Sequence, residues 1–247
     1  MEKYNRDTVN ILGVLVDRGD FDKAFDKCKT FFDTNSAHAV YTPNPEIIMH
    51  AYRSEEYKDV LNRADMVVPD GIGVVYASKI VGKPVKGRVA GFELSSALLK
   101  WCGEQNKKVY LFGGKPGVAD DAANKISENN PGIIIAGTNH GYHKSYEHIA
   151  DEIAKTGADL VLVCLGAPKQ EKWIDENKDK TGAKVLIGAG GSLDVFAGNV
   201  KRAPLFFRKL NLEWFYRLIT QPSRFVRMLD LPRFAIKVLL HGEKQKG

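Results

Sequence analysis

The ten residues Ala64–Gly73, ADMVVPDGIG, join a short apolar run to an acid that stands between proline and glycine. Met66–Val68 has the length and composition of a short buried strand, and Pro69 ends it. Asp70 therefore stands at the mouth of that strand, with glycine on its far side. A carboxylate in this position is either a cap for a helix that begins near Ile72 or a catalytic group.

Similar apolar runs alternate with segments of helical period along the rest of the chain. The predicted strands are Ile11–Val16, Ala39–Thr42, Met66–Val68, Val109–Phe112, Ile133–Ala136, Leu160–Leu165 and Val185–Ile187. Examples of the predicted helices are Phe21–Phe32, Glu46–Tyr52, Phe92–Cys102, Ala119–Ile126 and Ile149–Ala154. This alternation indicates an α/β fold, a Rossmann-like and mostly parallel sheet with helices on both faces. We expect residues 1–198 to form this core and residues 199–247 to form a basic helical appendage.

The positive charge is concentrated at the C-terminal end. Residues 199–247 contain eleven Lys/Arg and three Asp/Glu, although the formal net charge of the whole chain is only +6. Pro222 and Pro232 are expected to divide this segment into short helices. One expected helix combines apolar and basic residues, namely Arg208, Lys209, Leu210, Trp214, Phe215, Arg217, Leu218 and Ile219. Basic amphipathic helices are typical of membrane-surface elements, and the alternative is a subdomain packed on the core with a solvated basic face.

Several common features are not predicted from the sequence. Charged residues interrupt the first twenty positions, so no signal peptide is expected, and no apolar stretch of about 18 residues could span a bilayer. The three cysteines lack the spacing of a disulfide framework or a zinc site, and we interpret them as core thiols. The single DxD sequence, Asp20–Asp22, is interpreted as a helix cap. His140 and His143 are interpreted as loop histidines, so no metal site is predicted.

Polar or glycine-rich loops follow five of the predicted strands. They are TPNPE from Thr42, PDG from Pro69, FGGKPG from Phe112, LGAPKQE from Leu165 and GAGGSLDVFAG from Gly188. Ligands of such sheets bind outside the carboxyl ends of the strands. Glycine lets backbone N–H groups approach a phosphate or a sugar, and a helix N-terminus favours negative charge. Five such loops on one edge predict a ligand cleft.

Two other function classes are weighed against these loops. The sequence GGKPG is not the GxGxxG pattern of a dinucleotide-binding oxidoreductase, and no acid follows the next strand to hold a ribose. A nucleic-acid-binding module could use the basic tail, but its aromatic residues lie at helical spacing rather than on strands as stacking platforms. An NAD(P)-dependent oxidoreductase and a nucleic-acid-binding module are kept as alternatives.

Six motifs occur in a fixed order: TPNPE, ADMVVPDGIG, GRVAGFEL, FGGKPG, LGAPKQE and GAGGSLDVFAG. With them the chain resembles the TagA/WecG/CpsF family, glycosyltransferase family 26, over residues 8–200 and into the basic tail. The resemblance implies transfer of N-acetylmannosamine from UDP-N-acetylmannosamine to GlcNAc-diphospho-undecaprenol, with inversion and with neither metal nor cofactor. The product would enter wall teichoic acid linkage units or related surface polysaccharides. It implies a cytoplasmic enzyme, peripheral on the inner face of the membrane, and leaves a homo-oligomer open.

The resemblance also favours a catalytic role for Asp70, as the base that takes the proton of the acceptor hydroxyl. Thr42, assigned to the catalytic set, and Asn44 would orient a sugar through hydrogen bonds, unless TPNP is only a turn. Arg88 would hold a diphosphate bidentately, unless it is a solvated surface arginine.

The remaining expected contacts concern the nucleotide and the diphosphates. Gln170 would read the uracil or a ribose hydroxyl, unless it belongs to an ordinary first helical turn. Glycines at two strand exits, together with one acid, would surround the nucleotide: Gly113, Gly114, Gly190, Gly191 and Asp194. Three arginines of the tail, Arg217, Arg224 and Arg227, would clamp a diphosphate over the cleft.

Overall fold

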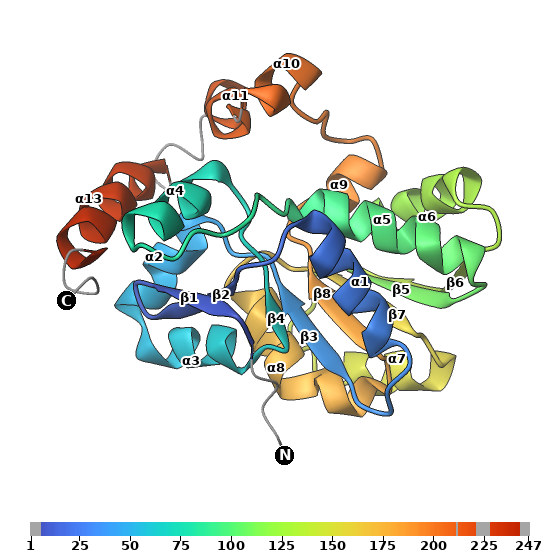
Figure 1. Ribbon diagram of the computed structural model, residues 1–247. Helices are drawn as coiled ribbons and strands as arrows, with labels where there is room; N and C mark the ends of the chain where they lie inside the picture. The colour runs from blue at the N-terminus through green and yellow to red at the C-terminus, as the bar shows by residue number, and fades with distance from the viewer. Residues whose placement is uncertain (1–5, 211, 221–227, 243–247) are drawn as a thin grey trace.

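The computed structural model describes residues 6–210, 212–220 and 228–242 (Figure 1). At its centre lies a six-stranded sheet of order β4-β3-β8-β7-β5-β6, in which every neighbouring pair is parallel. The strands are β3 (His38–Tyr41), β4 (Met66–Val67), β5 (Lys108–Gly113), β6 (Ile134–Asn139), β7 (Leu160–Cys164) and β8 (Val185–Gly188). The predicted α/β class with a Rossmann-like parallel sheet is therefore confirmed.

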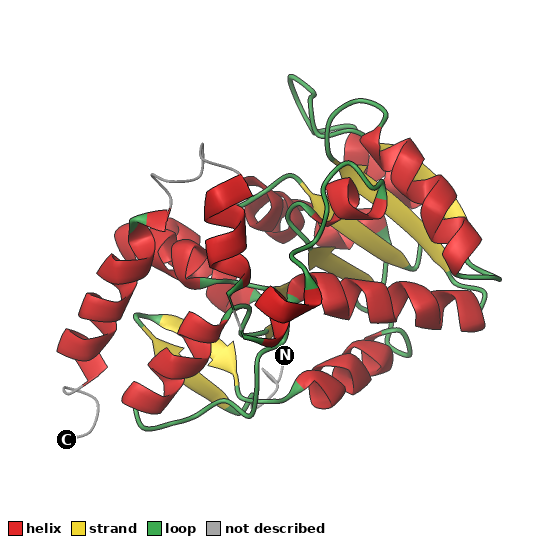
Figure 2. Cartoon of the chain, turned by 90° about the horizontal axis from the view of Figure 1, so that it is seen from above, coloured by secondary structure: helices red, strands yellow, loops and turns green. Residues whose placement is uncertain are grey.

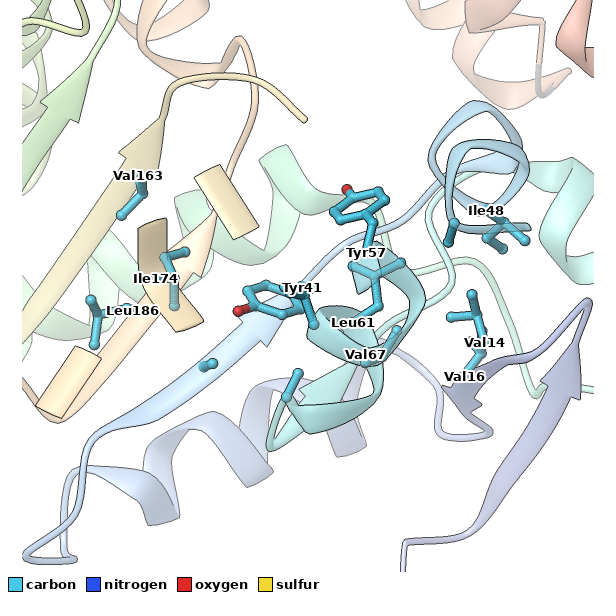
Figure 3. Packing of buried hydrophobic residues seen from close by; sticks show 14 of the residues in the cluster. Val14, Val16, Tyr41, Ile48, Tyr57, Leu61, Val67, Val163, Ile174 and Leu186 are labelled. Atoms are coloured by element: carbon cyan, nitrogen blue, oxygen red, sulfur yellow. The ribbon is translucent and has the colours of Figure 1, made fainter. Parts of the chain in front are cut away.

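Side chains of the sheet alternate between two hydrophobic cores, because successive residues of a strand point to opposite faces. One core contains Tyr41, Phe112 and Val163 and is covered by α2 (Pro45–Arg53), α3 (Glu55–Arg63), α4 (Ile72–Ile80), α7 (Ile149–Thr156) and α8 (Lys169–Thr181). Figure 3 shows part of this core, including Tyr41 and Tyr57. The other core is covered by α1 (Phe21–Phe31), α5 (Gly91–Glu104), α6 (Val118–Asn129) and α9 (Ser192–Phe196). The helices thus lie on both faces, as predicted.

The predicted strand Ile11–Val16 is wrong. The chain forms a hairpin there, with β1 (Thr8–Ile11) antiparallel to β2 (Val14–Asp17), and Figure 2 shows it apart from the main sheet. Leu12 and Gly13 have φ values of 52° and 95°, the two positive values that a tight hairpin turn requires. The side-chain oxygen of Asn10 accepts a hydrogen bond from the N–H of Gly13 at 2.8 Å and closes the turn.

Two smaller predictions are confirmed. Asp20 is the N-cap of α1, where its side chain accepts a hydrogen bond from the Lys23 N–H at 3.0 Å. The three cysteines, Cys28, Cys102 and Cys164, are buried and free. Burial raises the pKa of each thiol to about 12, so all three remain protonated core side chains at neutral pH.

The C-terminal segment contains α10 (Leu205–Lys209), α11 (Glu213–Thr220) and α13 (Asp230–Gly242). The expectation that Arg208 and Lys209 share a helix with Trp214 is wrong, because α10 ends before α11 begins. Pro232 lies in the first turn of α13, as expected of a helical proline. No helix within the described ranges is long and apolar enough to cross a membrane.

The last helix is part of the core rather than a separate arm. α13 packs against α2 and α4, and Figure 1 shows it beside them. Phe234 and Val238 are 3% and 1% exposed and belong to the same core as the sheet residue Tyr41. By contrast, α10 carries no buried residue. The segment is thus anchored through its last helix.

Candidate active site

The five loops predicted to form a cleft leave the sheet on one edge, because the adjacent strands β4, β3, β8, β7 and β5 are all parallel. Hydrogen bonds join these exits directly. The donor and acceptor pairs are Asp70 N–H to Pro43 O at 3.2 Å, Thr42 Oγ1 to Gly188 O at 3.1 Å, Gly190 N–H to Gln170 Oε1 at 3.0 Å and Gly114 N–H to Cys164 O at 3.2 Å. The exits therefore form one connected surface.

Asp70 does not cap the helix that follows it. That helix, α4, begins at Ile72 as predicted, but its N-cap is Gly71, with a φ of 96°. The Asp70 carboxylate instead accepts a hydrogen bond at 3.2 Å from the N–H of Gly91, the first residue of α5. Its other oxygen lies 3.6 Å from Nε of Arg88. The carboxylate is thereby held between the N-terminal end of α5 and the guanidinium of Arg88.

Arg88 is not a solvated surface arginine. Its side chain is 21% exposed and contacts two carboxylates, those of Asp70 and of Glu213 on α11. Burial lowers the pKa of Arg88, but the two carboxylates outweigh this effect and the pKa is raised above its usual value. A partly buried, permanently charged guanidinium beside Asp70 is suited to a diphosphate.

A second arginine, Arg202, completes this cluster, although it was not among the predicted site residues. Nη2 of Arg202 lies 3.6 Å from Glu213 and 3.0 Å from Glu93. The guanidinium stacks over the ring of Phe92 at 4.4 Å from its centre. Glu213 thus occupies a position between Arg88 and Arg202. Residues so far apart in the chain carry no common motif, so only the fold reveals the cluster.

The side chains of Thr42 and Asn44 both form hydrogen bonds with backbone groups of the protein. Thr42 is buried, its hydroxyl donates to Gly188, and a Cβ on Gly91 would lie 2.7 Å from its Oγ1. Asn44 is the N-cap of α2 and accepts a hydrogen bond at 3.0 Å from the N–H of Ile47. The turn interpretation of Asn44 is therefore correct, and a sugar contact of either residue stays a prediction.

Gln170 is buried at the start of α8, where both ends of its amide have partners within the protein. Its oxygen accepts from the Gly190 N–H at 3.0 Å, and its nitrogen donates to Glu171 at 2.8 Å. The other oxygen of Glu171 accepts a hydrogen bond from the Tyr57 hydroxyl at 3.0 Å. Burial raises the pKa of Glu171, against the effect of these hydrogen bonds. The expected contact of Gln170 with uracil or ribose stays a prediction, while its contact with the Gly190 loop is direct.

The surroundings of the glycines differ from one strand exit to another. A Cβ on Gly190 or Gly191 would meet no atom within 4 Å, so their loop borders open space. A Cβ on Gly113, whose φ is 132°, would lie 2.3 Å from the carbonyl oxygen of Cys164, so here the packing of β5 on β7 requires glycine. Gly114 has a φ of 71°, and Asp194 is half-buried on α9. Ligand contacts of these residues stay predictions.

The expected arginine clamp lies outside what the structure describes. Arg224 and Arg227 belong to residues 221–227, and the side chain of Arg217 is likewise not described. Over the described ranges, no three His, Cys, Asp or Glu side chains gather as a metal site would require. The site available for inspection is therefore Asp70, Arg88 and the neighbouring strand exits.

A parallel sheet that gathers a carboxylate, a guanidinium and open glycine loops at one edge is suited to a phosphorylated ligand, which a glycosyltransferase with a sugar nucleotide as donor requires. The sequence comparison agrees, since the model of the glycosyl transferase WecG/TagA/CpsF family matches residues 9–247. The chain belongs to this family. The six-motif resemblance is thereby confirmed.

Curated relatives share one name, N-acetylglucosaminyldiphosphoundecaprenol N-acetyl-beta-D-mannosaminyltransferase. The protein from Bacillus spizizenii is 43% identical over 212 residues, covering 86% of this chain and 82% of its own length. The Bacillus subtilis protein is 41% identical over 218 residues, covering 88% and 85%. The Staphylococcus aureus protein is 37% identical over 248 residues, covering 99% and 97%.

Proposed function

We propose that this glycosyltransferase moves N-acetylmannosamine from UDP-N-acetylmannosamine to GlcNAc-diphospho-undecaprenol, with inversion at the anomeric carbon. The observation that carries the proposal is the Asp70 carboxylate, fixed by Gly91 and Arg88 at the sheet edge. The names of the relatives supply the acceptor and the transferred sugar, and the UDP-linked donor is what family membership implies. Because the chain belongs to a glycosyltransferase family, the oxidoreductase and nucleic-acid-binding hypotheses are set aside. The product fits the linkage unit of wall teichoic acid or a related surface polysaccharide.

In the proposed step, the acceptor hydroxyl gives its proton to Asp70 as its oxygen attacks the anomeric carbon. The bond between that carbon and the UDP oxygen breaks, and UDP leaves with the electron pair on the opposite face. A base placed in this way contributes about 10²–10⁴-fold to the rate. Arg88 would lie against a diphosphate, and the open Gly190–Gly191 loop would border the nucleotide. The tail arginines are still expected to close over it.

The first experiment measures UDP release from UDP-N-acetylmannosamine in the presence of a GlcNAc-diphospholipid analogue. We expect the Asp70→Asn variant to lose about 10²–10⁴-fold in kcat, with its KM for the donor little changed. Asp26→Asn, which removes an exposed carboxylate of α1, is the control. Normal turnover by Asp70→Asn with both substrates bound would remove Asp70 from its catalytic role. UDP-N-acetylglucosamine as an equally good donor would contradict the assigned sugar.

We further propose that the C-terminal segment brings the enzyme to the membrane surface, where a polyprenyl-linked acceptor resides. Exposed apolar side chains lie on both short helices, with Phe206 on α10 being 66% exposed and Trp214 and Phe215 on α11 each 41% exposed. Arg208 and Lys209 stand beside them at the end of α10. Each cation near an anionic leaflet contributes about 1 kcal/mol.

Co-sedimentation with lipid vesicles tests this attachment. Binding is expected to vesicles that contain anionic lipid, to weaken with salt, and to fall in the Phe206→Ser/Trp214→Ser variant. Tyr142→Ser is the control, because Tyr142 is 65% exposed but lies in the loop before α7. Equal binding by the double variant and the wild type would exclude α10 and α11 as the membrane contact.

A further inference from the structure

An apolar cavity of about 460 Å³ lies between α4, α11 and α13. Apart from the Tyr76 hydroxyl and the Trp214 indole N–H, the described side chains that line it are entirely apolar. The walls include Ile72 and Ile80 of α4, together with Phe234 and Val238 of α13. This volume falls within the range of about 300–1,000 Å³ that is typical of small-molecule sites.

The cavity opens at the surface instead of being sealed in the core. Tyr76 is 56% exposed, and Trp214 and Leu229 are 41% and 40% exposed, although all three line the cavity. An aromatic rim around an apolar interior suits a ligand that enters from a membrane interface, because tyrosine and tryptophan side chains favour that region.

Two residues that line the cavity are close in the chain to the proposed reaction centre. Ile72 is separated from Asp70 by Gly71 alone. Trp214 directly follows Glu213, whose carboxylate pairs with Arg88. Two of the helices that line the cavity, α4 and α11, therefore begin within a few residues of the groups expected to hold the acceptor hydroxyl and the diphosphate.

We propose that the cavity binds the isoprenoid units nearest the diphosphate of the acceptor. This proposal rests on the proposed function, which assigns a polyprenyl-linked acceptor. A polyprenyl chain is apolar throughout and is joined directly to the diphosphate, so its first units must lie next to the phosphate site. The cavity is far too small for a complete undecaprenyl chain, and the remainder stays in the bilayer. α4 and α13 thus select a lipid-linked acceptor over a water-soluble one.

Filling the cavity tests the proposal. Ala235 lines the cavity but is exposed, so Ala235→Trp adds bulk there without entering the core. The matched control is Ile236→Trp, because Ile236 is the next residue of α13, is 56% exposed and does not line the cavity. Leu229→Gln, which makes the rim polar, is a second variant. Thermal unfolding confirms that each variant is folded.

Kinetics in detergent use two acceptors, GlcNAc-diphosphate on a long polyprenyl chain and, as the short acceptor, the methyl ester of the same headgroup, which has no chain to place in the cavity. Ala235→Trp is expected to raise the KM for the long acceptor about tenfold or more, with the KM for the short acceptor and for the donor unchanged. Ile236→Trp should leave all three values unchanged. Equal changes for both acceptors, or no change for either, would overturn the proposal.

A binding measurement separates this proposal from the proposed function. Polyprenyl diphosphate without a sugar is titrated against the full chain by isothermal titration calorimetry. Saturable binding that Ala235→Trp weakens supports the cavity even if no sugar transfer is found with any acceptor. Binding that is unaffected by Ala235→Trp, or a change in dimer content on filling the cavity, assigns the surface to the bilayer or to a second copy and overturns the proposal.

Discussion

Gln170 shows how a single side chain can be oriented by a neighbour that is remote from substrate. Its amide nitrogen faces Glu171, so its oxygen must face the N–H of Gly190. Tyr57, from α3, donates to the second oxygen of Glu171. A chain of three hydrogen bonds therefore links α3 to the loop that borders the proposed nucleotide site. The buried Glu171 is a positioning residue, because it acts on this loop only through Gln170.

Removing the first donor of this chain tests its role. In Tyr57→Phe, a buried oxygen of Glu171 loses its partner, which costs about 1–3 kcal/mol of unfolding free energy. The KM for the UDP-sugar should rise more than kcat falls, because the Gly190 loop loses its support. Tyr142→Phe, at an exposed tyrosine, is the control. A lower melting temperature with an unchanged KM would show that the chain of bonds only stabilises the fold.

Individual residues of the site could be predicted from the sequence when they belong to a motif. The residues that they contact in the fold could not. Asp70 and Arg88 each stand in a recognisable motif, yet nothing in the sequence shows that they lie 3.6 Å apart. Glu213 and Arg202 stand outside the six motifs, and only the fold brings Glu213 to Arg88 and to Arg202. Gln170 stands in a motif, but its burial depends on long-range contacts that a local pattern does not encode.

At the scale of elements, the continuous apolar strands of the parallel sheet were predictable, because both faces of such strands are buried. The hairpin was not. The turn residues Leu12 and Gly13 interrupt an apolar stretch, and leucine rarely adopts the positive φ of 52° that it has here. The apolar run from Ile11 to Val16 therefore reads as one strand in the sequence, although it crosses a turn.

The docking of α13 provides a prediction about pH. Arg53 of α2 pairs with Asp230 at the start of α13, with Nη1 3.0 Å from Oδ2. This hydrogen bond, helped by Arg233, lowers the pKa of Asp230 below its usual value. The folded protein then binds fewer protons than the unfolded chain. The pair therefore stabilises the fold above the unfolded pKa of about 3.9, and the effect is lost as the pH falls through the lower folded pKa.

Thermal unfolding of Arg53→Gln at pH 6 and at pH 3 checks this prediction. At pH 6 the variant should be less stable by about 0.2–1 kcal/mol, because Arg53 is partly exposed. At pH 3 the difference from the wild type should shrink. Lys115→Gln is the control, since Lys115 is exposed in the loop before α6 and is not among the groups that shift the pKa of Asp230. A difference that is the same at both pH values would mean that the pair does not anchor α13.

At the scale of the whole molecule, the C-terminal segment stabilises the core and shapes its active edge. Deleting residues 199–247 removes Phe234 and Val238, which are buried against the core. Burial of each contributes about 1.5–3 kcal/mol, so the remaining protein should melt several degrees lower. It should also lose most activity on a water-soluble acceptor, because the expected arginine clamp is lost. If the truncated protein turned over that acceptor at the full rate, residues 199–247 would serve only to attach the enzyme to the membrane.

The placement of Glu213 between two guanidiniums has a consequence for substrate binding. Arg88 and Arg202 share a counter-ion from the protein itself, so part of their positive charge is already balanced. A substrate diphosphate that reaches Arg88 must take the place of that carboxylate, and binding becomes an exchange of one anion for another. Weak anions such as inorganic phosphate gain little from such an exchange, whereas a diphosphate with two groups to offer gains more. Trp214, which lines the apolar cavity, follows Glu213 in α11. When the diphosphate displaces the Glu213 carboxylate from Arg88, the same turn of helix therefore carries the change to the wall of the cavity.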